Sequence, residues 1–270
     1  MRHIITKMAG TGFFLAALSA TAAAESVETV QSRGLDQKYV LTEPEGDPVA
    51  SVILLAGGHG KLDVSSFLGS ASFGWGKDNS LVRSREMFAD QGFLVATMDA
   101  PSDKGKMNAI WRMGDEHAED IAAVAAALKQ RADKPVWVIG TSMGSFSAAN
   151  AGVSLGGGID GIVSTSSVTK SRSKWSIADD YPDGIIDMNL SAVKVPVLVV
   201  AHEDDACKIT PPDDLDALAA AFSNSPKVGK LLLSGGDTPR SDPCKALSAH
   251  GFLGIEEQTV KGIADFIKAN

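Results

Sequence analysis

The stretch Val138-Ile139-Gly140-Thr141-Ser142-Met143-Gly144-Ser145 decides the fold predicted for this chain. It contains the motif G-x-S-x-G, with an apolar strand pattern at residues 135–139 before it and a helical pattern at 143–151 after it. A serine on so tight a strand-to-helix turn needs a strained backbone, and the two glycines keep β-carbons out of its way. We therefore expect Ser142 Oγ to project above the end of a sheet as a nucleophile. The backbone N–H of Met143 would face a developing oxyanion.

Outward from this motif, short apolar runs alternate with helical patterns. Residues 115–131, for example, carry apolar side chains at the spacing of one helix face. Buried strands separated by amphipathic helices predict an α/β fold with a mainly parallel sheet and helices on both faces. A hairpin at residues 26–42 would add antiparallel strands at one edge. The other expected strands are 50–55, 93–98, 135–139, 161–164, 196–200 and 230–233, and the expected helices are 81–90, 115–131, 143–151, 213–222 and 255–268.

Residues 25–270 are predicted to form a single domain, because no linker, repeat or low-complexity tract divides them. Residues 166–189 interrupt the alternation of strands and helices, with Trp175 and Tyr181 among scattered charges. This segment is either a small lid over a site or a plain surface excursion, and we favour the lid.

A serine hydroxyl is a weak nucleophile unless a base takes its proton, so a histidine is required. His250 lies in a loop after the last expected strand and before the last expected helix, where an imidazole can reach the strand ends. His117 opens a helix among acidic residues, and His202 ends a strand, which favours surface and structural roles for these two. His250 is the predicted base.

The imidazole in turn needs a carboxylate that fixes its tautomer and stabilises its charged form. The strand at residues 196–200 continues into the acidic loop His202-Glu203-Asp204-Asp205. We expect Asp205 to be this acid, with Asp204 as the alternative. Asp179 and Asp180, which follow the preceding strand, are more remote candidates.

A glycine-rich loop follows an early strand, in the stretch Leu54-Leu55-Ala56-Gly57-Gly58-His59-Gly60. Glycines let the backbone approach a ligand closely, so this loop is expected to supply a second N–H donor to an oxyanion hole, near His59. It does not fit a phosphate-binding loop, because GxxxxGK[ST] fails in register around Gly60-Lys61-Leu62.

The chain has two cysteines, Cys207 and Cys244, and no C-x-x-C motif. Cys207 lies two residues after Asp205, and Cys244 lies six before His250. We expect a disulfide that ties the acid loop to the base loop, rather than two buried free thiols.

Residues 1–24 have the pattern of a cleaved secretory signal peptide, with Arg2 and Lys7 before a short apolar stretch and Ala22-Ala23-Ala24 before Glu25. The predicted location is therefore periplasmic or secreted, without stable membrane insertion. The formal charge of −8 would become −10 after cleavage. A chain this acidic, without a basic cluster, is not expected to bind nucleic acid. The sequence carries no signal of oligomeric state.

From about residue 50 onward the chain resembles the α/β-hydrolase superfamily, and more narrowly its exported proteobacterial members of unassigned substrate. It is more loosely similar to cutinase-like esterases. The order of Ser142, an acidic residue and His250 along the chain is the order of that fold. The shared segments are Asp99-Ala100-Pro101-Ser102-Asp103, Gly140–Gly144, Asp204-Asp205-Ala206-Cys207-Lys208, Pro211-Pro212, Ser241-Asp242-Pro243-Cys244 and His250-Gly251-Phe252.

This resemblance implies an α/β-hydrolase fold and a serine hydrolase that needs no cofactor or metal. The main expectation is hydrolysis of small-molecule carboxylic esters through a Ser-His-Asp triad and an acyl-enzyme. Thioester, lactone or peptide hydrolysis would use the same residues. The alternative of a different class is an exported binding protein that keeps the fold without turnover.

Overall fold

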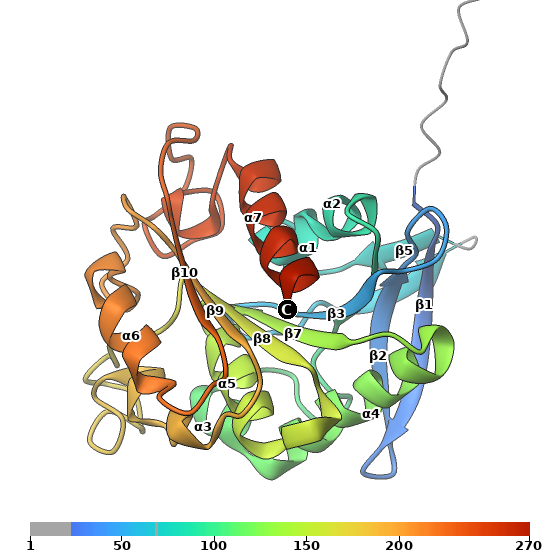
Figure 1. Cartoon of the computed structure of the whole chain (residues 1–270), viewed down its shortest axis with the longest axis horizontal. Coiled ribbons are helices and arrows are strands. Elements are labelled where there is room, and N and C mark those ends of the chain that lie inside the picture. The colour runs from blue at the N-terminus through green and yellow to red at the C-terminus, as the bar shows by residue number, and fades with distance from the viewer. Residues whose placement is uncertain (1–22, 68–69) are drawn as a thin grey trace, which may run out of the picture.

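The computed structural model describes residues 23–67 and 70–270. The predicted signal peptide, residues 1–24, thus lies almost wholly outside the described residues. Strands and helices alternate along the chain (Figure 1). The strands are β1 (Glu25–Ser32), β2 (Leu35–Thr42), β3 (Ala50–Leu55), β4 (Val64–Phe67), β5 (Ser70–Phe73), β6 (Phe93–Met98), β7 (Val136–Thr141), β8 (Gly161–Thr165), β9 (Val197–His202) and β10 (Val228–Leu233). The α-helices are α1 (Ser80–Arg83), α2 (Arg85–Asp90), α3 (Ala109–Met113), α4 (Asp115–Ala132), α5 (Gly144–Ser154), α6 (Leu215–Ala221) and α7 (Glu256–Ala269).

Eight of these strands form one sheet in the order β1-β2-β6-β3-β7-β8-β9-β10. The six strands β6, β3, β7, β8, β9 and β10 are parallel to one another. Strands β1 and β2 form an antiparallel hairpin, and β2 pairs antiparallel with β6. Strands β3, β6, β7, β8 and β9 are buried along their whole length, as expected for a parallel sheet covered on both faces. The predicted fold class and its antiparallel edge are confirmed.

Helices cover both faces of the sheet (Figure 1). On one face, α1, α2 and α7 pack through apolar residues such as Phe88 and Ile263. On the other face, α3, α4 and α5 pack through residues such as Ile121 and Phe146. Alternate residues of β3 contribute to the two cores, with Val52 on the first side and Ile53 on the second, because successive side chains of a strand point to opposite faces.

Three features differ from the elements expected from sequence. The expected helix at 81–90 is two helices, α1 and α2, which meet at Ser84. A separate two-stranded hairpin, β4 and β5, and the short helix α3 were not expected. The hairpin is rich in serine and the helix has only five residues, so neither offers enough periodic apolar pattern to be recognised.

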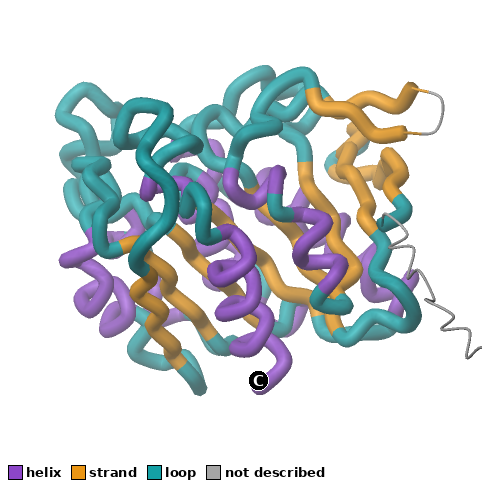
Figure 2. The backbone as a smooth tube through the Cα atoms, turned by 90° about the horizontal axis from the view of Figure 1, so that it is seen from above, coloured by secondary structure: helices purple, strands orange, loops and turns teal. Residues whose placement is uncertain are grey.

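Loops gather along one edge of the sheet (Figure 2). The carboxyl ends of the parallel strands β3, β7 and β9 lie at one edge because adjacent parallel strands run in the same direction. The chain segments that follow these three strands carry the predicted oxyanion loop, nucleophile and acid. In open α/β sheets, ligands bind outside this edge.

Candidate active site

Ser142 lies on the turn between β7 and α5, and its backbone has a positive φ of 51°. A non-glycine residue rarely takes this left-handed conformation, which persists only where surrounding contacts hold it. The Ser142 N–H donates to the carbonyl of Thr165, 3.0 Å away on the neighbouring strand. A β-carbon at Gly140 would collide with the carbonyl of Gly144, so the turn could not close with a larger residue there. The serine is half-buried, at the start of the helix.

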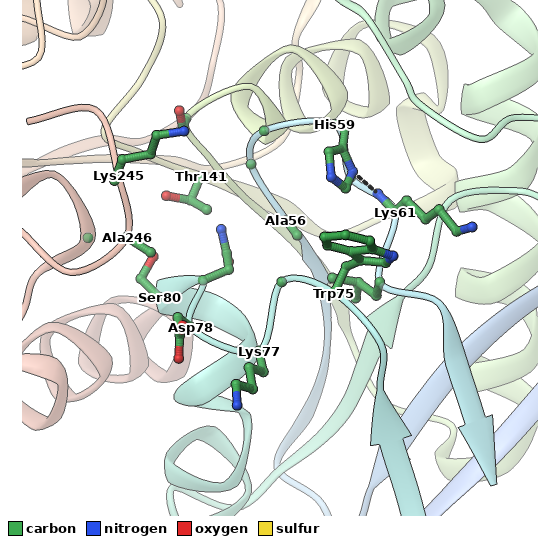
Figure 3. A pocket seen from close by; sticks show the side chains of 18 of the residues that line it. Ala56, His59, Lys61, Trp75, Lys77, Asp78, Ser80, Thr141, Lys245 and Ala246 are labelled. Atoms are coloured by element: carbon green, nitrogen blue, oxygen red, sulfur yellow. Dashed lines mark hydrogen bonds between the residues drawn. The ribbon is translucent and has the colours of Figure 1, made fainter. Parts of the chain in front are cut away.

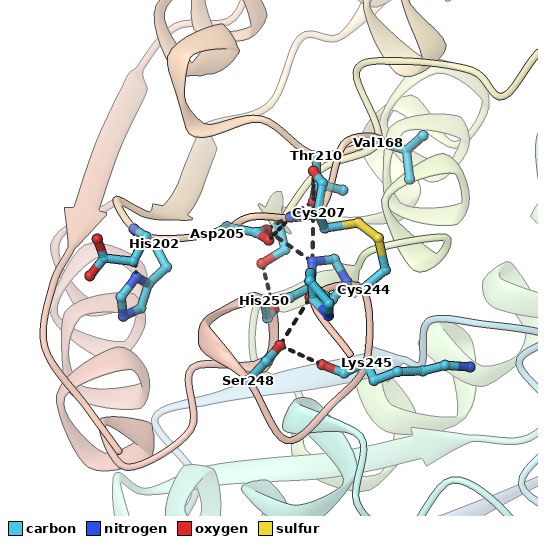
Figure 4. A network of polar contacts seen from close by, with 12 residues as sticks. Val168, His202, Asp205, Cys207, Thr210, Cys244, Lys245, Ser248 and His250 are labelled. Carbon is cyan, nitrogen blue, oxygen red and sulfur yellow. Dashed lines mark hydrogen bonds and ion pairs between the residues drawn. A yellow bond between two sulfur atoms is a disulfide. The ribbon is translucent and has the colours of Figure 1, made fainter. Parts of the chain in front are cut away.

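Asp205 and His250 are in direct contact at the ends of two different loops (Figure 4). His250 Nδ1 lies 2.9 Å from Asp205 Oδ2. Both residues are buried, with 5% of the surface of His250 and 6% of that of Asp205 exposed. Asp205 Oδ2 also accepts a hydrogen bond from Thr210 Oγ1 at 2.8 Å, and Oδ1 accepts one from the Cys207 N–H at 2.9 Å. A carboxylate bonded this fully holds the imidazole with a proton on Nδ1, which leaves Nε2 free as an acceptor.

Asp204 is placed differently from its neighbour. Its side chain is exposed, and its backbone N–H donates to His202 Nδ1 at 3.0 Å. The other ring nitrogen of His202 is 2.9 Å from the carbonyl of Gly235, so this buried histidine joins two loops through its hydrogen bonds. Figure 4 shows His202 apart from the Asp205–His250 pair. This geometry puts Asp205, not Asp204, against the imidazole.

The predicted disulfide between Cys207 and Cys244 is present in the structure. It joins the loop that holds Asp205 to the loop that holds His250 (Figure 4). A second contact fixes the base loop, because Ser166 Oγ donates to the carbonyl of His250 at 2.8 Å. The Asp205 loop and the His250 loop are thus tied together covalently, and the His250 loop is also tied to the end of β8.

A pocket of about 540 Å³ opens above the strand ends. Ser142 and His250 both line it, together with the glycine loop that follows β3. No hydrogen bond joins Ser142 Oγ to His250 within residues 23–67 and 70–270. Catalytic hydrogen bonds are often long or poorly aligned without substrate and tighten in the complex. No residue of 166–189 is among those that line the pocket, so the lid at this segment stays a prediction.

The glycine loop lies directly beside Ser142. A β-carbon at Gly57 would be 3.0 Å from Ser142 Cβ, so the loop backbone is as near to the serine as packing allows. Met143, the predicted first oxyanion donor, immediately precedes α5 and has a helical backbone conformation. The segment from Gly57 to His59, with the predicted second donor, lines the same pocket.

The His59 side chain also lines this pocket, which the sequence did not indicate. Figure 3 shows it beside Trp75, and the two rings meet edge to face at 6.3 Å. Its Nδ1 accepts the Lys61 N–H at 3.1 Å. Burial, and then the charges of Lys106 and Arg112, lower the pKa of His59, so the ring is neutral and carries its proton on Nε2.

One group of residues has the spacing of metal ligands within the described ranges. Ligand atoms of Asp205, Cys207 and His250 lie within 4.8 Å of one another. The sulfur of Cys207 is bonded to Cys244 and offers no thiolate, so this group does not fit a metal site.

No protein-family model matches this chain, and no curated protein does either. Solved structures do match. Est1E from Butyrivibrio proteoclasticus is 13% identical with a TM-score of 0.61, over 90% of this chain and 97% of its own. A cold-adapted esterase from an Arctic intertidal metagenomic library is 14% identical with a TM-score of 0.54, over 96% and 99%. A serine hydrolase without a lid from Xanthomonas campestris is 14% identical with a TM-score of 0.53, over 88% and 94%.

The Xanthomonas protein is described as an α/β serine hydrolase, and this chain has the α/β-hydrolase fold. At this identity the likeness establishes the fold alone. In the part of the chain that the structure describes, no helix has the length and apolar character to cross a bilayer.

Proposed function

We propose that this protein is a serine hydrolase that cleaves carboxylic esters, with Ser142 as nucleophile, His250 as base and Asp205 as the acid that orients the base. The observation that carries the proposal is the buried pair of Asp205 and His250, 2.9 Å apart, at the wall of the pocket that holds Ser142 on a strained turn. Structural strain kept at a pocket residue is typical of functional sites. Neighbours described as an esterase and as a serine hydrolase support the reaction class.

The proposed mechanism starts from the contact between His250 and Asp205. His250 donates its Nδ1 proton toward Asp205, so Nε2 takes the proton of Ser142 as Oγ attacks the ester carbonyl. The N–H groups of Met143 and His59 stabilise the oxyanion of the tetrahedral intermediate. His250 then gives its proton to the leaving alcohol, which leaves an acyl-serine. A water molecule that gives its proton to His250 then attacks the acyl carbonyl, and the carboxylic acid and the free Ser142 hydroxyl are released.

The direct test is labelling of the purified protein with a fluorophosphonate probe, together with turnover of short-chain p-nitrophenyl esters. We expect the wild-type protein to be labelled at Ser142 and to hydrolyse the esters. The Ser142→Ala variant should be folded, unlabelled and inactive.

A wild-type protein that neither reacts with the probe nor turns over any ester would contradict the proposal. Ligand binding that survives Ser142→Ala in such an inert protein would favour a binding protein on the same fold. Turnover of thioesters, lactones or peptides in place of esters would leave the proposed roles of Ser142, His250 and Asp205 unchanged and would revise the substrate class.

We further propose that the protein acts after export, in the periplasm or outside the cell. The disulfide of Cys207 and Cys244 supports this location, because such bonds persist in oxidising compartments and are rare in the cytosol. Cell fractionation, with N-terminal sequencing of the mature protein, tests the location and the expected cleavage before Glu25.

A further inference from the structure

Arg112, on the short helix α3, lies directly beneath the glycine loop and is fully buried, with 0% of its surface exposed. It forms no ion pair with a carboxylate among the residues that the structure describes. Burying a guanidinium without a counter-charge is costly, and side chains of this kind are almost never fully buried unless they are paired. No sequence motif marks this arginine.

The guanidinium bonds to the carbonyls of the glycine loop instead. Nη2 donates to the carbonyl of Ala56 at 3.0 Å and, more weakly, to that of Gly58 at 3.4 Å. In a trans peptide unit the C=O and the N–H point in opposite directions. A guanidinium that holds these two carbonyls therefore turns the N–H groups of Gly57 and His59 away from itself.

Both of these N–H groups belong to the segment that lines the pocket beside Ser142. A hydrogen bond accepted by a peptide carbonyl also polarises the same peptide unit and makes its N–H a stronger donor. We infer that Arg112 is a positioning residue that aims and strengthens the oxyanion donors of the glycine loop. This inference rests on the proposed function, because it assumes that an oxyanion forms at Ser142.

Both the guanidinium and the main chain of Arg112 are also bonded to α5, the helix that follows Ser142. Nη1 donates to Ser147 Oγ at 2.8 Å, and Asn150 Nδ2 donates to the main-chain carbonyl of Arg112 at 3.1 Å. Ser147 and Asn150 both lie on α5, which starts just after Ser142. Arg112 thus bridges the two elements that carry the two predicted oxyanion donors.

Arg112 keeps its positive charge in this buried position. Burial lowers its pKa to about 9, so the guanidinium stays protonated at neutral pH. The nearby His117, whose Nε2 is 2.9 Å from Ser147 Oγ, is neutral because burial lowers its pKa to about 3. Arg112 is thus the charged member of this buried group, and its positive field extends beneath the place where negative charge would develop.

The test compares Arg112→Gln and Arg112→Lys with the wild-type enzyme. For Arg112→Gln we expect kcat to fall by about tenfold to a hundredfold, less than the roughly 10²–10³ that follows loss of a direct oxyanion donor. KM should change little. Arg112→Lys, which keeps the charge, should recover part of the loss. The inhibition constant of a trifluoromethyl ketone, which forms a stable oxyanion on serine, should rise in proportion to the fall in kcat/KM.

Arg33→Gln is the matched control. Arg33 is a mostly buried arginine bonded to Asp120 and Asp103, and its guanidinium packs on Trp111, next to Arg112 in sequence. Its loss should lower the melting temperature without changing kcat. If Arg112→Gln does not fold, Ser147→Ala removes one bond to the guanidinium and leaves the charge, with an expected fall in kcat of about threefold to tenfold.

A folded Arg112→Gln enzyme with wild-type kcat, or an unchanged inhibition constant, would overturn this inference alone. Wild-type kcat in Ser147→Ala would overturn it as well where Arg112→Gln cannot be purified. An inert wild-type protein would overturn both this inference and the proposed function.

Discussion

Two adjacent carboxylates, Asp204 and Asp205, have opposite surroundings in the structure. Asp205 is buried and accepts hydrogen bonds from Thr210, Cys207 and His250, whereas Asp204 is exposed. A one-residue shift in the loop after β9 would exchange these roles. The sequence favoured Asp205 by spacing alone, and Thr210, which supports both Asp205 and His250, lies in a loop without a recognisable pattern.

At this scale we expect Asp205→Asn to lower kcat by roughly 10³–10⁴, because the amide can stabilise the wrong tautomer of His250 and does not stabilise its charged form. The matched variant Asp204→Asn should keep kcat within about twofold, since an exposed side chain away from the base contributes little. Steady-state kinetics on a p-nitrophenyl ester measure both. Equal losses in the two variants would mean that the acid is assigned to the wrong residue.

At the scale of elements, the site depends on the contact between the glycine loop after β3 and the turn after β7. The strands are paired in register, with Leu55 opposite Gly140, so their ends carry Gly57 and Ser142 to the same place. A shift of either strand would separate the nucleophile from the predicted oxyanion donor. A side chain larger than hydrogen at position 57 is therefore excluded by the contact with Ser142 and Thr141 rather than by the backbone conformation of Gly57.

Gly57→Ala tests this contact. Its β-carbon would lie 3.0 Å from both Ser142 Cβ and the Thr141 carbonyl, so the loop or the turn must move by a few tenths of an ångström. Small misplacements of catalytic groups are costly, and we expect kcat/KM to fall by about tenfold or more.

Gly157→Ala is the control for this variant, because a β-carbon at that exposed position meets nothing within 4 Å. It should leave kcat/KM unchanged. Full activity in Gly57→Ala would show that the loop adapts and that its fit against the turn does not limit the reaction.

At the scale of the whole molecule, the Cys207–Cys244 disulfide closes the chain between two of the three predicted catalytic residues. Its sequence separation is 37 residues. In the chain-entropy account, closing a loop of this size stabilises the fold by about 4 kcal/mol. Since it holds the acid and base loops together, we expect it to affect both stability and turnover.

The double variant Cys207→Ala/Cys244→Ala should therefore unfold at a lower urea concentration than the wild type and have a lower kcat/KM at a temperature where both are folded. Reductant should shift the wild type toward the variant and leave the variant itself unchanged. A variant that is less stable yet fully active would limit the disulfide to a stabilising role.

The sequence alone predicts the fold class, the parallel sheet with its antiparallel edge, and the pairing of the two cysteines. It could do so because burial imposes a fixed period on strands and helices, and because a glycine-flanked serine between a strand and a helix is a local constraint. Strands β3 and β6 have the predicted bounds, since each is a run of mainly apolar residues that starts and stops with the strand.

The surroundings of the predicted residues, in contrast, are visible only in the folded chain. Thr210 meets Asp205 across a turn, the His59 ring meets Trp75, and Arg112 reaches Ala56 from a position 56 residues away along the chain. No periodic pattern or local motif in the sequence indicates these contacts, because each one forms between segments that are distant along the chain or lie in irregular loops. Local patterns record only whether a side chain is buried, whereas its partners are set by how the whole sheet assembles.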